Sequence, residues 1–340
     1  MGQNHSPIID INGRKIGFNY PAYIIAEAGL NHNGDVKIAK KLVDQALNCG
    51  VDAIKFQTYI SEEFLASSSE YFDFFKNVEL SKKDFEEISN YAKDVGLTFF
   101  SAPFDNDSVD FLDNLNVPCF KIASSDITNY PLVKKIAQKK KPIIISTGAS
   151  TINEIQNTID WCLNEKNDKI ALLHCVVNYP TLPEETNLLA MNVMKKKFDV
   201  PVGYSDNGES TLVDLVAVSL GATIIEKHFT LDKTMDGPDH SFSIEPPQLK
   251  ILVSEIRMVE SIRGKEIKSI QLSEEKIKPI VRKSITAKIN LNSNDVIDST
   301  KISIKRPSGG IEPIEYEKVL GKKVKNSILK DEIIQWQDLY

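Results

Sequence analysis

The chain has 340 residues, of which 41% are hydrophobic and 26% are charged, and its formal net charge is −6. This composition predicts a globular protein of two domains, or of one large domain with an appendage, and excludes an intrinsically disordered chain. The negative charge argues against a nucleic-acid partner, and no apolar run approaches the roughly 20 residues that a membrane span needs. We therefore expect no membrane partner, and the lack of a recognisable export signal predicts a cytoplasmic location.

The first predicted element is a hairpin within residues 1–20, because "IIDINGRKIGF" alternates apolar and polar residues around the turn Asn12-Gly13. Short runs rich in Val, Ile and Phe then recur between residues 21 and 265, and each has the length of a buried strand. These eight predicted strands are Tyr23–Ala28, Asp52–Gln57, Thr98–Pro103, Cys119–Ser124, Pro142–Thr147, Ile170–Cys175, Pro201–Asp206 and Thr223–Phe229.

Segments of helical periodicity separate these strands. Ser81 with Asp84, and Thr151 with Glu154, have the spacing of an N-terminal capping pair, while Gly96 stands where a helix ends. Strands that alternate with helices predict parallel pairing, and eight such units favour a closed (β/α)8 TIM barrel over 21–265. The alternative is an open dinucleotide-binding sheet, but no GxGxxG follows the first strand.

The pattern changes after the barrel. Residues 266–280 are charged and predict a linker. Residues 281–340 consist of short alternating stretches, "SITAKINL", "KISIKR" and "KVKNSIL", which predict a small, mostly β domain. The predicted fold class is therefore α/β, a TIM barrel followed by a small β domain.

Polar residues gather where the predicted barrel strands end, which is where such barrels carry their active sites. Each of them alone is commonly structural, since a strand-end serine often caps a helix and a lone histidine often lies in a core. Lys55, Lys121, Glu226 and His228, however, interrupt core-like runs, and an unpaired buried charge costs several kcal/mol.

The residue types point to the chemistry. Two lysines with nearby serines form a receptor for a phosphate group. His228, the loop at 205–207 and Glu226 offer ligands for a hard divalent cation. Glu27 is a candidate acid, base or hydroxyl acceptor. The residues alone predict an enzyme that acts on a phosphorylated small anion. The candidate ligands at 205–207, Glu226 and His228 leave metal-assisted catalysis open.

A series of motifs, in order, resembles the sialic acid synthase family. They are "IIAEAGLNHNGD", "IKFQTY", "FKIASSDI", "PIIISTGAS", "LLHC" with "NYPT", "VGYSD", "IIEKHFTLDK", "GPDHSFSIEP" and "IKRPSGGI". The resemblance implies condensation of phosphoenolpyruvate with an N-acetylmannosamine-type sugar. It also implies a TIM barrel followed by an antifreeze-like (SAF) domain, a domain-swapped homodimer, and a divalent metal, Mn²⁺ or Mg²⁺.

The resemblance also assigns roles to single residues. Lys55, Lys121, Ser124, Ser146 and Ser205 would hold phosphoenolpyruvate. Glu27 would face the reacting aldehyde, and Glu226 would lie beside the pyruvyl carbons. The expected catalytic residues are thus Glu27, Lys55, Lys121 and Glu226, and the expected sugar contacts are Gln57, Asn178, Tyr179, Asp239 and, from the partner subunit's small domain, the equivalent of Arg306. His228 would be a metal ligand.

Three positions depart from the family pattern. Asn207 stands where a second metal-binding histidine is expected, so an amide oxygen would ligate the metal. Val177 occupies the usual position of an asparagine, with Asn178 beside it, and Ala102 replaces a small hydroxyl residue.

These features leave the substrate open. The motifs favour a synthase for a 2,4-diacetamido sugar, as in legionaminic acid synthesis. An N-acetylneuraminate synthase, a synthase for a phosphorylated aldose and a catalytically impaired paralogue are the alternatives.

Overall fold

The computed structural model describes residues 7–340; residues 1–6, which belong to the expected N-terminal segment, lie outside the described part. The chain divides into two compact units, Met1–Gly264 and Lys265–Tyr340. Within the described residues, no helix is long and apolar enough to cross a membrane.

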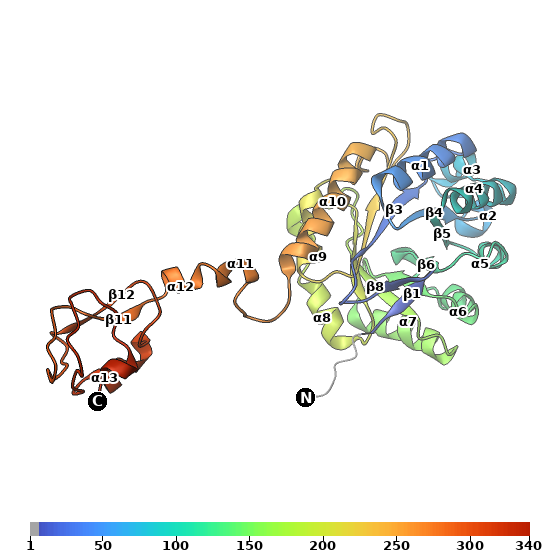
Figure 1. Cartoon of the computed structure of the whole chain (residues 1–340). Helices are drawn as coiled ribbons and strands as arrows, with labels where there is room; N and C mark the ends of the chain where they lie inside the picture. The colour runs from blue at the N-terminus through green and yellow to red at the C-terminus, as the bar shows by residue number, and fades with distance from the viewer. Residues whose placement is uncertain (1–6) are drawn as a thin grey trace. The chain divides into compact units, whose positions relative to one another are not determined.

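Eight parallel strands of the first unit close into a barrel in the order β10-β3-β4-β5-β6-β7-β8-β9. The prediction of a TIM barrel is therefore confirmed, and Figure 1 shows helices arranged around these strands. The strands are β3 Tyr23–Gly29, β4 Ala53–Thr58, β5 Thr98–Pro103, β6 Phe120–Ile122, β7 Ile143–Ser146, β8 Ile170–Cys175, β9 Val202–Asp206 and β10 Ile224–His228. Their residues are almost all buried, as expected of a parallel sheet covered on both faces.

The helices begin and end where the capping residues indicate. In α4, the Ser81 hydroxyl accepts from the Asp84 N–H at 3.2 Å, and Gly96 ends the helix with φ 85°. Thr151 and Glu154 cap α7 in the same way. The helices of this unit are α1 Val36–Cys49, α2 Ser61–Phe64, α3 Phe72–Val78, α4 Lys82–Val95, α5 Asn106–Asn114, α6 Tyr130–Gln138, α7 Ile152–Asn164, α8 Ala190–Lys197, α9 Thr211–Ser219 and α10 Pro246–Arg263.

The predicted hairpin is present as β1 (Ile9–Ile11) and β2 (Arg14–Ile16), which pair antiparallel around Asn12 and Gly13. Ile11 and Ile16 are fully buried in the same hydrophobic core as the barrel strands. The hairpin therefore belongs to the barrel unit.

The segment between β4 and α4 was not assigned to any element from the sequence. It contains α2 and α3, which are rich in phenylalanine and lie after the carboxyl end of β4. Their aromatic side chains form a separate cluster with Leu30 and Phe104, which follow β3 and β5. This insertion therefore lies over the mouth of the barrel.

The second unit has its own core of aliphatic residues, mostly isoleucine, with β11 (Ser284–Ala287) paired antiparallel to β12 (Ile302–Lys305). The short helix α13 (Tyr316–Val319) follows. Where the sequence predicts a linker, the structure has two short helices, α11 (Leu272–Glu275) and α12 (Lys278–Val281).

Candidate active site

A cavity of about 1060 Å³ opens at the carboxyl ends of the barrel strands. Most of the residues predicted from the sequence line it, although they come from strands far apart in the chain. Those residues are Glu27, Lys55, Gln57, Lys121, Ser124, Ser146, Tyr179, Ser205, Asn207, Glu226, His228 and Asp239.

Strand register brings the charged groups to the same level. In the barrel, Glu27 is the register partner of Lys55 on one side and of His228 on the other. An irregularity between Glu27 and Gly29 shifts the register of β3 against β4 just beyond this pair, and Gly29 has the positive φ of 50° that favours glycine. One level below, Glu226 is paired with Ser205. Residues paired in a parallel sheet point to the same face, so these side chains meet inside the mouth.

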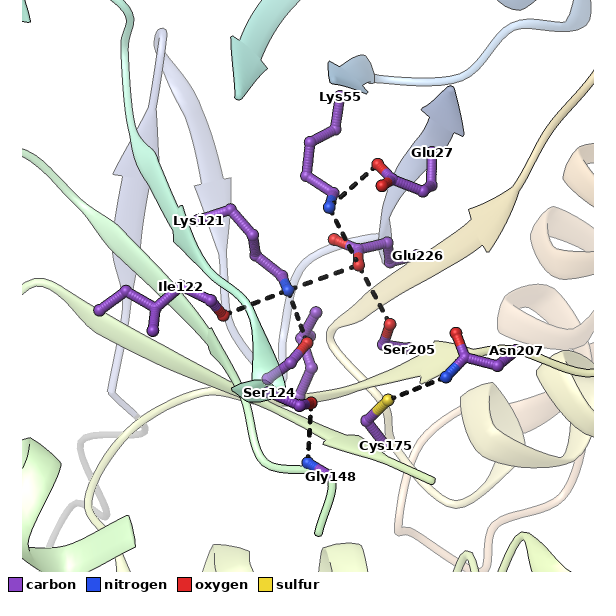
Figure 2. A network of polar contacts seen from close by, with 12 residues as sticks. Glu27, Lys55, Lys121, Ile122, Ser124, Gly148, Cys175, Ser205, Asn207 and Glu226 are labelled. Carbon is purple, nitrogen blue, oxygen red and sulfur yellow. Dashed lines mark hydrogen bonds and ion pairs between the residues drawn. The ribbon is translucent and has the colours of Figure 1, made fainter. Parts of the chain in front are cut away.

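Two lysines and two glutamates form a buried ion network (Figure 2). Lys55 Nζ lies 2.9 Å from Glu27 Oε2 and 3.6 Å from Glu226 Oε1, and Lys121 Nζ lies 3.5 Å from Glu226 Oε1. All four side chains are at most 6% exposed. Two positive and two negative charges thus balance before any ligand is bound.

Burial and pairing set the protonation of this network. Burial opposes the charge of Lys55, but Glu226 and Glu27 outweigh it and raise the pKa of Lys55. Burial lowers the pKa of Lys121 in spite of Glu226. The pKa of Glu226 is lowered, because Lys121 and Lys55 outweigh its burial, whereas burial raises the pKa of Glu27. The two carboxyls therefore differ in basicity, which suits different roles.

Hydroxyl groups complete a receptor for an anion on one side of the mouth. Lys121 Nζ donates to Ser146 Oγ at 2.6 Å, and Ser205 Oγ donates to Glu226 Oε1 at 3.0 Å. Ser124 Oγ accepts from the Gly148 N–H at 3.0 Å. A Cβ at Gly148 would lie 2.9 Å from that Ser124 oxygen, so only glycine fits there without displacement. Two ammonium groups with hydroxyls within reach suit a phosphate or carboxylate.

His228, at the end of β10, lies beside two aromatic rings. Its ring centroid is 5.9 Å from that of Tyr179 and 5.0 Å from that of Phe242. Its Nδ1 is buried without a hydrogen-bond partner in the described part of the chain and lies 3.9 Å from Asp239 Oδ2. Burial lowers the pKa of His228 and so favours the neutral ring, which is the form that binds a metal.

His228, Asn207 and Asp239 line the same cavity and carry donor atoms of the kinds that a hard divalent cation takes. Asn207 Nδ2 donates to Val176 O at 2.7 Å, so its amide oxygen is the atom able to ligate. With His228 and Asp239 this gives one nitrogen and two oxygens, a set that suits Mn²⁺ or Mg²⁺. No group of three His, Cys, Asp or Glu side chains able to hold a metal is found between residues 7 and 340. Remaining ligands would have to come from water or substrate.

One predicted residue of the barrel unit, Asn178, does not line this cavity. Asn178 is exposed, and its side chain donates to Glu185 Oε2 at 3.0 Å, whereas its neighbour Val177 does line the cavity. Arg306 follows β12 in the second unit, where it is exposed. Ala102 is buried in β5 and is not in the cavity wall.

The sequence analysis missed two groups. The first is the aromatic cluster of α2 and α3, whose signal was the dense run "YFDFF". The second lies behind the mouth, where Lys227 is an ion-pair partner of Asp206 and lies 3.6 Å from Asp214, all three fully buried. Lys227 and Asp206 alternate with the cavity residues of β10 and β9, so they point away from the mouth.

Comparison with known proteins adds to this geometry. A model of the NeuB family matches residues 42–268, and a model of the SAF domain matches residues 282–339. The chain belongs to the NeuB family. Its small second unit is accordingly an SAF domain, as the resemblance implied.

Individual NeuB relatives match over nearly the whole chain. An uncharacterized protein of Methanocaldococcus jannaschii is 46% identical over 97% of this chain and 98% of its own. The N,N'-diacetyllegionaminic acid synthase of Campylobacter jejuni is 41% identical over 92% of this chain and 98% of its own. A crystal structure of the N-acetylneuraminic acid synthetase of Leptospira borgpetersenii, in complex with citrate, is 37% identical with a TM-score of 0.77, and the match covers 81% of this chain and 96% of that one.

Proposed function

We propose that this NeuB protein is a nonulosonic acid synthase, which condenses phosphoenolpyruvate with an open-chain N-acetylmannosamine-type sugar and releases phosphate. The observation that carries the proposal is the buried network of Lys55, Lys121, Glu27 and Glu226 beside the serines of one cavity. Phosphoenolpyruvate carries a carboxylate at C1 and a phosphate on the oxygen of the neighbouring C2, and two ammonium groups match these two anions.

The proposed reaction follows from where the groups lie. Lys55, Lys121 and the three serines bind phosphoenolpyruvate, and its C3 attacks the sugar aldehyde to form the new C–C bond. The alkoxide formed takes up a proton, for which the raised pKa of Glu27 makes this carboxyl a suitable donor. Water then adds to the cationic C2 and releases a proton, which restores the acid form of Glu27, and the C2–O bond to phosphate breaks as C2 becomes a ketone.

Charge moves during this sequence, and the fixed ion network accommodates it. Glu226 Oε2 is buried without a hydrogen-bond partner in the described residues, so one carboxylate oxygen remains available to the cation that develops at C2. Preorganised charges of this kind contribute up to about 3 kcal/mol each to lowering a barrier. A divalent cation held by His228, Asn207 and Asp239 would, when bound, polarise the sugar aldehyde.

For the sugar, we propose a 2,4-diacetamido substrate, with an N-acetylneuraminate synthase as the second candidate. The legionaminic acid synthase relative supports the first and the N-acetylneuraminic acid synthetase structure supports the second. Gln57, Tyr179 and Asp239 line the cavity and are the proposed sugar contacts. A synthase for a phosphorylated aldose is disfavoured, because Lys55 and Lys121 are the only lysines or arginines among the described residues that line the cavity.

We further propose a homodimer, located in the cytoplasm, in which each small domain supplies Arg306 to the other subunit's sugar. The exposed position of Arg306 after β12 leaves its guanidinium available for this contact. Arg306→Ala should raise the KM for the sugar and leave phosphoenolpyruvate binding unchanged. Equal kinetics in the variant and the wild type would refute the trans contact.

The test of the activity is phosphate release from phosphoenolpyruvate and Mn²⁺ with a panel of acetamido sugars, followed by mass spectrometry of the product. Lys121→Met is the variant expected to be inactive, and Lys134→Met, which removes a 42% exposed lysine side chain from α6, is the control for loss of a lysine. Release with an acetamido sugar and not with phosphorylated aldoses supports the proposal. Binding of phosphoenolpyruvate without turnover of any sugar would instead identify a catalytically impaired paralogue.

A further inference from the structure

One wall of the cavity is apolar and is not explained by the proposed chemistry. We define the aromatic wall as six apolar residues that line the cavity. Four come from the inserted segment between β4 and α4, and two come from the loops after β3 and β5. They are Leu30, Phe64, Phe74, Phe75, Val78 and Phe104. They belong to one hydrophobic cluster that is separate from the barrel core.

The aromatic wall is held in place by its own packing. The ring centroids of Phe64 and Phe104 are 4.7 Å apart, and Phe75 lies 5.2 Å from Phe64 and 5.6 Å from Phe74. Tyr59 supports it from behind with rings 5.4 to 5.6 Å away and donates its hydroxyl to Phe75 O at 3.0 Å. Interlocked aromatic pairs of this geometry are favourable, so the wall exists before a ligand arrives.

The wall and most of the anion receptor come from different strands of the barrel. Its residues follow β3, β4 and β5, whereas Lys121, Ser124, Ser146 and Ser205 belong to β6, β7, β9 or the loops after them. The other lysine of the receptor, Lys55, is on β4, and its ammonium group is paired with Glu27 and Glu226. In the barrel order β3, β4 and β5 are consecutive, and β6 follows β5. A substrate whose reacting end meets Glu27 on β3 can therefore extend its far end toward the wall.

Among residues 7–340, the inserted segment contributes no lysine or arginine to the cavity lining. The only lysine of the inserted segment, Lys76, does not line the cavity and is paired with Glu62 at 2.9 Å and Glu79 at 3.3 Å. A phosphate or hydroxyl placed against these six apolar side chains would lose water and gain no partner from them, which disfavours it. Tyr71, which is 59% exposed, is the residue of the inserted segment that brings a hydroxyl to the cavity lining. A methyl group placed against the six apolar side chains gains from burial.

We propose that the aromatic wall is the specificity subsite for the far end of the sugar and selects an acylamino sugar whose terminal carbon is a methyl group. Sugars with a terminal hydroxymethyl group bind more weakly, and sugars with a terminal phosphate are rejected. This inference rests on the proposed function, because it takes the reacting end of the sugar to lie at Glu27.

The first test compares kcat/KM for three sugars at saturating phosphoenolpyruvate: 2-acetamido-2,6-dideoxymannose, N-acetylmannosamine and N-acetylmannosamine 6-phosphate. The first two differ by one oxygen, and we expect the deoxy sugar to be preferred by about 10- to 100-fold. Phe74→Ser should reduce this preference to about threefold or less, because it places a hydroxyl in the wall. Phe72→Ser is the matched control, since Phe72 lies on the same helix and does not line the cavity.

The second test measures binding without turnover. The alditols of the deoxy sugar and of N-acetylmannosamine have no aldehyde and cannot react, and their affinities in the presence of phosphoenolpyruvate are compared by saturation-transfer NMR. Tighter binding of the deoxy alditol, lost in Phe74→Ser and kept in Phe72→Ser, supports the wall even in an enzyme that turns over slowly. Equal affinities, or equal kcat/KM for the first two sugars, overturn the inference and leave the synthase activity standing. Absence of phosphate release with every sugar refutes the proposed function instead.

Discussion

Lys121 offers a direct test of the anion receptor. Its ammonium group is 3.5 Å from Glu226 and donates to Ser146, and it lies where the proposed phosphoenolpyruvate would bind. Lys121→Met keeps most of the side-chain volume and removes the charge. Glu226 remains paired, with Lys55 at 3.6 Å and the Ser205 hydroxyl at 3.0 Å, so we expect the variant to fold.

The size of the effect follows from the charges. The wild-type network is balanced, with two lysines and two glutamates, whereas the variant presents a net charge of −1 to an anion. It also loses a charge-assisted hydrogen bond worth about 1.5–3 kcal/mol. The Kd for phosphoenolpyruvate should therefore rise by about 10- to 150-fold.

The assay is isothermal titration calorimetry of phosphoenolpyruvate without sugar, together with circular dichroism to show that the variant is folded. Lys134→Met, which removes an exposed lysine from α6, should bind like the wild type. A folded Lys121→Met protein whose Kd is within twofold of the wild-type value would show that Lys121 does not bind the anion.

Three further predictions concern other parts of the mouth. The kcat/KM should fall as pH is raised through the pKa of Glu27, which burial raises, because the proposed donor carries its proton only below that pKa. Glu27→Gln should lose most activity and this basic limb, and a retained limb would assign it to another group. Asn207→His should tighten Mn²⁺ binding by about tenfold or more, because imidazole is a stronger ligand than an amide oxygen. Titration followed by electron paramagnetic resonance measures the affinity, and an unchanged value would place the metal elsewhere. Gly148→Ala should weaken phosphoenolpyruvate binding in calorimetry, because its Cβ would lie 2.4 Å from Val177 and 2.9 Å from Ser124 Oγ, and Val177→Ala in the same chain should restore part of it; wild-type binding by Gly148→Ala would contradict the close fit.

Much of the barrel was predictable because its signals are local. The capping pairs at Ser81 and Thr151 and the terminal Gly96 act within one helical turn, and the structure has the helices that they predict. The inserted segment was not predictable in the same way. Its helices α2 and α3 are short, and they gain stability from contacts with Leu30 and Phe104, which are distant in the sequence.

The candidate site shows the same division. Strand ends could be located from the sequence, so Lys55, Lys121, Glu226 and His228 were expected at one mouth, and they line one cavity. The neighbour pair Val177 and Asn178 could not be resolved, because which of two adjacent loop residues faces a cavity depends on the path of the loop. In the structure Val177 lines the cavity and Asn178 binds Glu185.

The sequence by itself determined the order of strands and helices, the two-part organisation and the residue types at the strand ends, because hydrophobic periodicity and turn chemistry act over short distances. Only the tertiary structure decided which charges compensate one another. Lys55 meets Glu27 and Glu226 because closure of the barrel sets the register between β10, β3 and β4. The aromatic wall arises in the same way, since its residues follow three different strands and meet only when the barrel is closed.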